Sequence, residues 1–189
     1  MKHILPIITL TTLAAAASAQ SAAPAGLSYN QISISRSQLN TGLGVQSLIG
    51  SSNVLLGLQT ASQKSGASNE GLQLSAGYVF RNVVAGIDAT VSFTQPQWEC
   101  AAYGINLRRS LSEIYAGLEV SLGYADTLVS GQGTYLTVDG ASQWAKHVWT
   151  ASVSYNINKQ YQVSLGRAEF SPASGAKQSF DSVSVRYNF

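Results

Sequence analysis

The sequence contains few charged residues, a single cysteine and little histidine. Only 11% of its 189 residues are Asp, Glu, Lys or Arg and the formal net charge is +2, whereas soluble domains carry roughly 25% charged residues. A chain this close to neutrality offers no basic field for nucleic acid. Cys100 cannot form an intramolecular disulfide, and His147, the only histidine beyond His3, gives no zinc-ligand spacing. We therefore expect no nucleic-acid partner, no metal and no cofactor.

Long hydrophobic runs are also missing beyond the N-terminus. The most apolar run, 4–17, follows Lys2 and His3 and ends in a small-residue sequence, Ala17-Ser18-Ala19. It is short for a spanning helix and has the form of a secretory signal peptide cleaved before Gln20. We predict a signal peptide at 1–19, a short periplasmic segment at 20–26 and one folded domain at 27–189.

What the sequence does contain is alternation of apolar and polar residues. In the last segment Val183, Val185, Tyr187 and Phe189 would occupy one face, and Ser184, Arg186 and Asn188 the other. This period of two is typical of a strand with one apolar side. We interpret ten such segments as strands, each about as long as the 9–11 residues that a tilted membrane-spanning strand needs. They are 27–36, 41–49, 53–63, 71–81, 83–94, 100–110, 113–124, 144–156, 159–170 and 179–189.

The connections between these segments alternate between short and long, except that the first, around 38–40, is short where a long loop is expected. Short turns are expected at 50–53, 81–82, 110–112 and 156–159, and longer loops at 62–70, 94–100, 125–142 and 171–177. Short turns at one rim and long loops at the other are typical of outer-membrane barrels, whose turns lie in the periplasm. The pattern predicts an all-β fold, a transmembrane antiparallel up-and-down β-barrel of about ten strands with periplasmic termini. Eight strands is the alternative, if one hairpin lies outside the membrane.

Two hairpin-like stretches and the C-terminal residues carry a family resemblance. The stretches "LSAGYVFRNVVAGIDATVSF" and "ASVSYNINKQYQVSLG", and the ending Tyr187-Asn188-Phe189, resemble small outer-membrane barrels of Gram-negative bacteria. These are of the outer membrane protein A transmembrane-domain, opacity-protein and porin-like type. The resemblance implies that 27–189 lies in the cell outer membrane, with outer-membrane lipids and the barrel assembly machinery as partners. It also implies that Tyr187 and Phe189 form the C-terminal signal which that machinery recognises.

Five charged residues are candidates for the interior of such a barrel. The polar faces of the segments would direct Asp88, Arg108, Glu119 and Arg186 into the lumen, with Lys146 as a further member. The interior of a small barrel is largely filled by side chains, and buried charges need partners. We therefore predict a lumen charge network that fills the lumen; a charge-lined passage is the alternative.

The extracellular loops are the other candidate functional surface. The longest loop, 125–142, contains "TYLTV", which could extend the barrel wall as a hairpin arm. A structural or surface-interaction role through loops that contact an extracellular ligand or host surface is favoured. A narrow porin-like channel for small solutes is the alternative. A lipid-modifying enzyme is disfavoured, because the His-x-Ser arrangement of the lipid A deacylases would need serine where Trp149 follows His147. No catalytic residue is predicted.

Overall fold

The computed structural model describes residues 27–38, 40–63, 71–96, 101–127, 134–138, 141–172 and 176–189. The predicted signal peptide at 1–19, the segment 20–26 and Cys100 lie outside these residues. Across these ranges no helix is long and apolar enough to cross a bilayer. The strands are β1 (Gln31–Ser37), β2 (Asn40–Leu48), β3 (Val54–Gln63), β4 (Gly71–Val84), β5 (Ile87–Pro96), β6 (Ala102–Ser110), β7 (Leu118–Thr127), β8 (Thr134–Val138), β9 (Ala141–Asn156), β10 (Tyr161–Pro172) and β11 (Gln178–Asn188).

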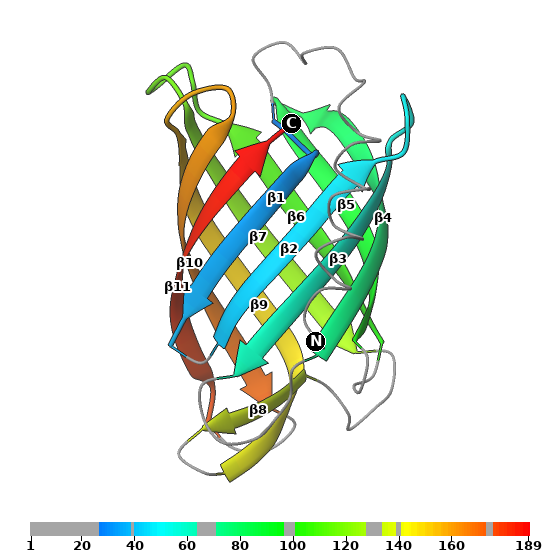
Figure 1. The fold of residues 1–189 in the computed structure, drawn as a ribbon, viewed down its shortest axis with the longest axis vertical. Helices are drawn as coiled ribbons and strands as arrows, with labels where there is room; N and C mark the ends of the chain where they lie inside the picture. Colours follow the sequence, from blue (N-terminus) through cyan, green and yellow to red (C-terminus); the bar gives the residue numbers. More distant parts are fainter. Residues whose placement is uncertain are drawn as a thin grey trace, which may run out of the picture.

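Ten of these eleven strands form a closed antiparallel barrel (Figure 1). Each strand pairs with the next along the chain, except that β7 pairs with β9, and β8 pairs only with the start of β9. Pairing of β1 with β11 closes the sheet, with Ile34 opposite Val185 and Gln31 opposite Asn188. The prediction of a ten-stranded all-antiparallel up-and-down barrel is confirmed within the described residues, and the eight-stranded alternative is wrong.

The alternation along each strand places large apolar side chains on the outside of the barrel. Ile34, Val185 and Val163 lie in one row across the β1–β11–β10 seam, and Ile34, Leu165 and Val185 are 59%, 65% and 49% exposed. On the other face of the same strands, Ser33 lies opposite Arg186, and Ser35 opposite Ser184. An apolar surface of this extent is unfavourable in water and is the outward surface of barrels that contact lipid.

Several predicted strand boundaries differ from those of the structure. Residues 27–30 are not in a strand, because the chain turns into the barrel before β1 begins at Gln31. The turn expected at 81–82 lies instead at Ala85-Gly86, after a register shift between Phe80 and Val84. Asn82 and Ala85 have φ near +50° and the Gly86 N–H donates to Asn82 Oδ1 at 2.9 Å. Asn tolerates this conformation, which makes the bulge possible.

The turn between β6 and β7 is longer than expected at 110–112. Leu111 N–H donates to the Leu118 carbonyl at 2.8 Å, so 112–117 form the turn and Glu113 is not in a strand. Gly117 has φ of 84°, and a Cβ there would lie 2.8 Å from the Asn156 carbonyl. The 112–117 turn therefore requires glycine at position 117.

The hairpin arm expected within 125–142 is present. Strand β8 pairs with the start of β9, from Thr134 opposite Ala145 to Val138 opposite Ala141. In Figure 1 this hairpin projects beyond the ring at the rim opposite the C-terminus. The barrel wall therefore extends further on this side than elsewhere among the described strands.

The closing pair of strands can be tested by Val185→Pro. Proline removes a ladder N–H at the seam, and in lipid each unsatisfied backbone group costs several kcal/mol. We expect wild-type protein refolded in lipid vesicles to migrate differently on gels when unheated and when boiled, and Val185→Pro to lose the unheated folded band. Val185→Thr, which keeps the N–H and β-branching, is the control. A Val185→Pro band that still shifts on heating would contradict closure through this pair.

Candidate functional site

The inner face of the barrel differs in accessibility from one rim to the other. Near the loop rim the inward-facing side chains of Gln59 and Thr150 are exposed. Toward the turn rim, Ser154 and Ser164 are 4% exposed and Gln162 only 2%. On β3 and β9, these inward side chains toward the loop rim are thus exposed to solvent, whereas those toward the turn rim are buried.

Small residues occupy many of the inward-facing positions of the lumen. A Cβ on Gly42 would lie 2.9 Å from Ser35 Oγ and 3.3 Å from Gln59 Nε2, both of which belong to inward-facing side chains. The neighbouring inward positions are also small or neutral, as in the Ser121–Ser152 hydroxyl contact of 2.8 Å. Further inward-facing glycines are Gly44, Gly57, Gly77, Gly104, Gly123 and Gly166. These positions carry little side-chain volume, whereas Phe170 and Phe180, whose rings lie 5.6 Å apart, occupy inward positions near the loop ends of β10 and β11.

The turn-side end is closed by residues 27–30, which we call the N-terminal constriction. Leu27 and Tyr29 are 7% and 3% exposed and pack with Val79, which is fully buried, and with Leu48 and Leu55. The constriction is a hydrophobic contact inside an otherwise polar lumen. Burial of these side chains stabilises it by about 1.5–3 kcal/mol for each large apolar residue.

Asn30 fixes the constriction to the barrel wall. Its Oδ1 accepts hydrogen bonds from Leu48 N at 2.8 Å and Ser47 Oγ at 3.2 Å. Its carbonyl accepts from Phe189 N at 3.1 Å. Residues of β2 and the residue after β11, the two strands that flank β1, therefore hold the segment where it enters the lumen.

Tyr29 lies between two guanidinium groups and a carboxylate. Its ring centre is 4.6 Å from Arg81 Cζ and 4.9 Å from Arg108 Cζ, within range of cation–π attraction. Its hydroxyl donates to Asp88 Oδ2 at 3.0 Å. Burial raises the pKa of Tyr29 to about 12. The positive charge of Arg108 lowers this pKa, whereas the negative charge of Asp88 raises it further. The phenol therefore remains a hydrogen-bond donor at neutral pH.

The central ion pair of the lumen joins Arg108 to Glu119. The distance from Nη2 to Oε2 is 2.9 Å, and both side chains are at least nine-tenths buried. Arg108 Nη1 also donates to the Ser28 carbonyl at 2.8 Å. One arginine thus links the constriction to the barrel wall eighty positions further along the chain.

A chain of hydrogen bonds extends from Glu119 across the lumen. Asn156 Nδ2 donates to Glu119 Oε1 at 2.7 Å, and Gln162 Nε2 donates to Asn156 Oδ1 at 2.9 Å. Arg186 Nη1 then donates to Gln162 Oε1 at 3.0 Å. Buried polar groups that are satisfied in this way hold a defined arrangement.

Four of the five predicted lumen residues come together around the constriction. Asp88 contacts Tyr29, Arg108 pairs with Glu119, and Arg186 joins through Gln162. Lys146 does not belong to this group, because it is exposed on the part of β9 that approaches the loop rim, beside His147.

Sequence reasoning missed Arg81, Tyr29 and Gln162 as members of this group. Arg81 lies 3.6 Å from Asp88 and occupies an inward position of β4, so its place in the alternation was a usable signal. The role of Tyr29 had no such signal, because 27–30 was interpreted as strand.

The residues of the predicted C-terminal signal lie on the seam. Tyr187 is on the outward face, with its ring 5.4 Å from that of Tyr161, and Phe189 follows β11. Their recognition by the assembly machinery stays a prediction. Among the described residues, no group of three or more His, Cys, Asp or Glu is placed to hold a metal.

Comparison with known proteins gives a fold relationship. No protein-family model matches the sequence, and no curated protein does. The chain is similar to the solved structure of the KdgM porin, with a TM-score of 0.53 and 13% identity over 86% of this chain and 99% of that one. It also matches the Acinetobacter baumannii outer membrane protein Omp33, with a TM-score of 0.42 and 10% identity over 87% of this chain and 100% of that one. The fold is a porin-like outer-membrane barrel; a specific tie to the outer membrane protein A or opacity type is not supported.

The buried ion pair leads to a stability prediction. Arg108→Leu would leave Glu119 buried without its charged partner, which costs about 3–5 kcal/mol. We expect this loss of unfolding free energy in urea titrations of the vesicle-embedded barrel, followed by tryptophan fluorescence. Arg108→Leu/Glu119→Leu should recover most of it. Arg109→Leu is the matched control, because its pair with Glu113 is as short at 2.8 Å but exposed, worth less than about 1 kcal/mol. Equal losses for Arg108→Leu and Arg109→Leu would contradict the burial of this pair.

Proposed function

We propose that the chain is an outer-membrane channel of the porin-like kind, a narrow passage for small hydrophilic solutes closed down by the N-terminal constriction. The observation that carries the proposal is the gradient of exposure along the lumen, from open Gln59 to buried Gln162. A wall packed solid with side chains would be buried along its whole inner length. The open loop-side half therefore supports a passage rather than a filled barrel.

The composition of the lumen favours small, largely uncharged solutes. The loop-side part is lined mainly by glycine, serine, threonine and glutamine, with Phe170, Phe180 and Lys146 also at inward positions. The other inward charges lie at the constriction. There three guanidinium groups, Arg81, Arg108 and Arg186, face two carboxylates, Asp88 and Glu119. This excess of one positive charge would give a modest preference for anions.

The constriction is held by few contacts, so its four residues can be displaced without unfolding the barrel. The constriction is four residues long. Hydrogen bonds to Asp88, Arg108 and Leu48 and a small apolar cluster hold it in place. A short segment of this kind can move without opening the ten-stranded ring, because its own backbone is not part of the sheet. We place the short turns in the periplasm, so that a solute entering between the loops reaches the constriction last.

A second function is favoured by the β8–β9 hairpin. This arm extends the wall beyond the ring on the loop side, and loops on a rigid scaffold are common binding surfaces. Contact with an extracellular ligand or host surface through this arm is compatible with a channel in the same molecule.

Conductance tests the proposed function. Tyr29→Ala removes the ring that fills the space between Arg81 and Arg108, so single-channel conductance in planar bilayers should rise at least about twofold, as the ring accounts for much of the closure. Tyr78→Ala is the control, because Tyr78 is exposed on the outward face. Absence of conductance in wild type and in Tyr29→Ala, with folded barrels confirmed by gel shift, would contradict the channel.

Ion selectivity gives an independent test. Arg186→Gln removes one of the three positive charges while its amide can still bond Gln162. We expect the reversal potential in a salt gradient to move toward cation preference, with little change in thermal stability. The outward-facing Arg167→Gln should leave the reversal potential unchanged, since Arg167 is exposed beside Asp181. A loss of stability without a shift of reversal potential would favour a purely structural lumen.

A further inference from the structure

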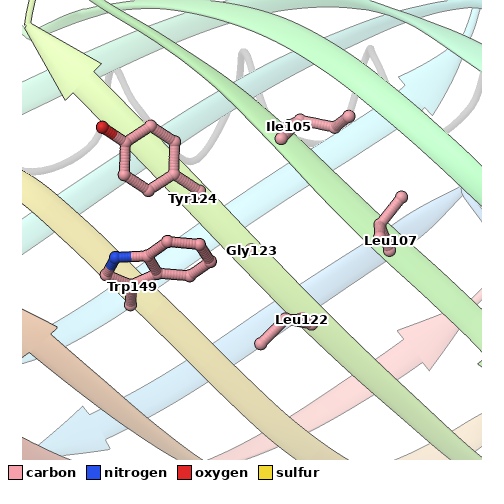
Figure 2. A pocket seen from close by; sticks show the side chains of 6 residues that line it. All are labelled: Ile105, Leu107, Leu122, Gly123, Tyr124 and Trp149. Carbon is pink, nitrogen blue, oxygen red and sulfur yellow. The ribbon is translucent and has the colours of Figure 1, made fainter.

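The outward face of the barrel carries an apolar groove close to the loop rim. It has a volume of about 390 Å³ and is lined by Ile105, Leu107, Leu122, Gly123, Tyr124 and Trp149. Figure 2 shows the side chains from β6, β7 and β9 around a gap over Gly123. The volume falls within the about 300–1,000 Å³ typical of ligand sites.

The register of three strands explains why the groove exists. Ile105, Tyr124 and Trp149 form one outward row, and Leu107 and Leu122 continue in the next row with Ala151. Gly123 lies between these two rows and lines the groove with its backbone. The Tyr124 and Trp149 rings pack at 4.7 Å between centroids and form one wall.

A polar cluster lies one row closer to the loops. Asp126 is opposite His147 in the ladder, and His147 Nδ1 is 3.2 Å from Asp126 Oδ2 and 2.8 Å from the Tyr124 hydroxyl. Both contacts use Nδ1, and neither involves Nε2. An apolar groove and a hydrogen-bonding cluster are thus continuous on the outside of the barrel.

The height of this cluster matches the edge of the apolar band. On the neighbouring strands the outward face also changes from apolar to charged, at the Arg167–Asp181 pair (3.4 Å) and the Glu169–Lys177 pair (2.7 Å). Arg167 and Glu169 are opposite Ala151 and Trp149 in the ladder, but because the strands are tilted (Figure 1), each ladder row lies closer to the loop rim on β10 than on β9. In a membrane such a change marks the headgroup level, so the groove faces acyl chains and the cluster faces headgroups.

We propose that this site holds a membrane glycolipid, with one acyl chain in the groove and its sugar headgroup at Asp126 and His147. The assignment rests on the membrane placement of the proposed function. A carboxylate accepts hydrogen bonds from sugar hydroxyls and repels phosphate, which favours a sugar over a phosphate headgroup. The half-exposed Trp149 ring offers an apolar face beside it.

Lipid retention tests this site. The full barrel is refolded into vesicles with equal parts of a diacyl glucosyl glycerolipid, phosphatidylethanolamine and phosphatidylglycerol of identical chains, then extracted in mild detergent. Mass spectrometry quantifies the co-purified lipids. We expect the glucolipid to be enriched over both phospholipids about threefold to tenfold, as one or two headgroup hydrogen bonds would give.

Variants separate the two parts of the site. Leu122→Trp fills the groove and should lower retention of the glucolipid to the level of the phospholipids, as should Asp126→Asn/His147→Ala at the headgroup end. Leu165→Trp is the matched control, because Leu165 is an exposed outward residue on β10 that does not line the groove, and it should retain the lipid as wild type does.

Equal retention of the three lipids by wild type would overturn the proposal, as would preferential retention of a phospholipid or an unchanged Leu122→Trp. Solute release is measured from the same vesicles. A barrel that does not insert or conduct refutes the proposed function, whereas one that inserts and conducts without lipid preference refutes only the glycolipid site.

Discussion

Closure of the sheet by β1 and β11 is the constraint on which the rest of the molecule depends. Strands inside a bilayer must have every backbone N–H and C=O paired, and only a ring without edges achieves this. Here the seam runs from Gln31 opposite Asn188 to Ser37 opposite Ser182. The ring in turn fixes which residues point inward, because successive residues of a strand alternate between the inner and the outer face, and the pairing register sets this parity. The polar lining of the lumen and the apolar outer groove follow from that parity.

The interior combines two kinds of surface that would be incompatible in an ordinary core. Toward the loops it carries mostly small and neutral side chains, with Phe170 and Phe180 among them. Toward the turns it is a layer of arginine, carboxylate, amide and tyrosine groups. Each charge in that layer has a partner, so the layer is stable although it is buried. Concentrating the charges at one level leaves few charged side chains on the rest of the inner face of the described strands.

The architecture was predictable and the constriction was not. Period-two alternation and alternating connection lengths determine the strand count and the inward position of Asp88, Arg108, Glu119 and Arg186, because both are local properties of the chain. The Leu27–Asn30 segment depends on contacts with residues far along the chain, such as Arg108, which no local pattern reveals. The bulge at Asn82 was missed because an Arg-Asn pair resembles a two-residue turn. Lys146 does not reach the charge network because it lies near the loop-side end of β9.

The link between Asn30 and Phe189 has a consequence for the order of assembly. The constriction is held by the Phe189 amide, the Arg108 side chain and the Leu48 amide, which come from the last, a middle and an early part of the chain. It can therefore become complete only when the final strand has docked. A barrel whose final strand has not docked would lack the hydrogen bond from Phe189 N to the Asn30 carbonyl, so the constriction would reach its final position only at the last step of folding.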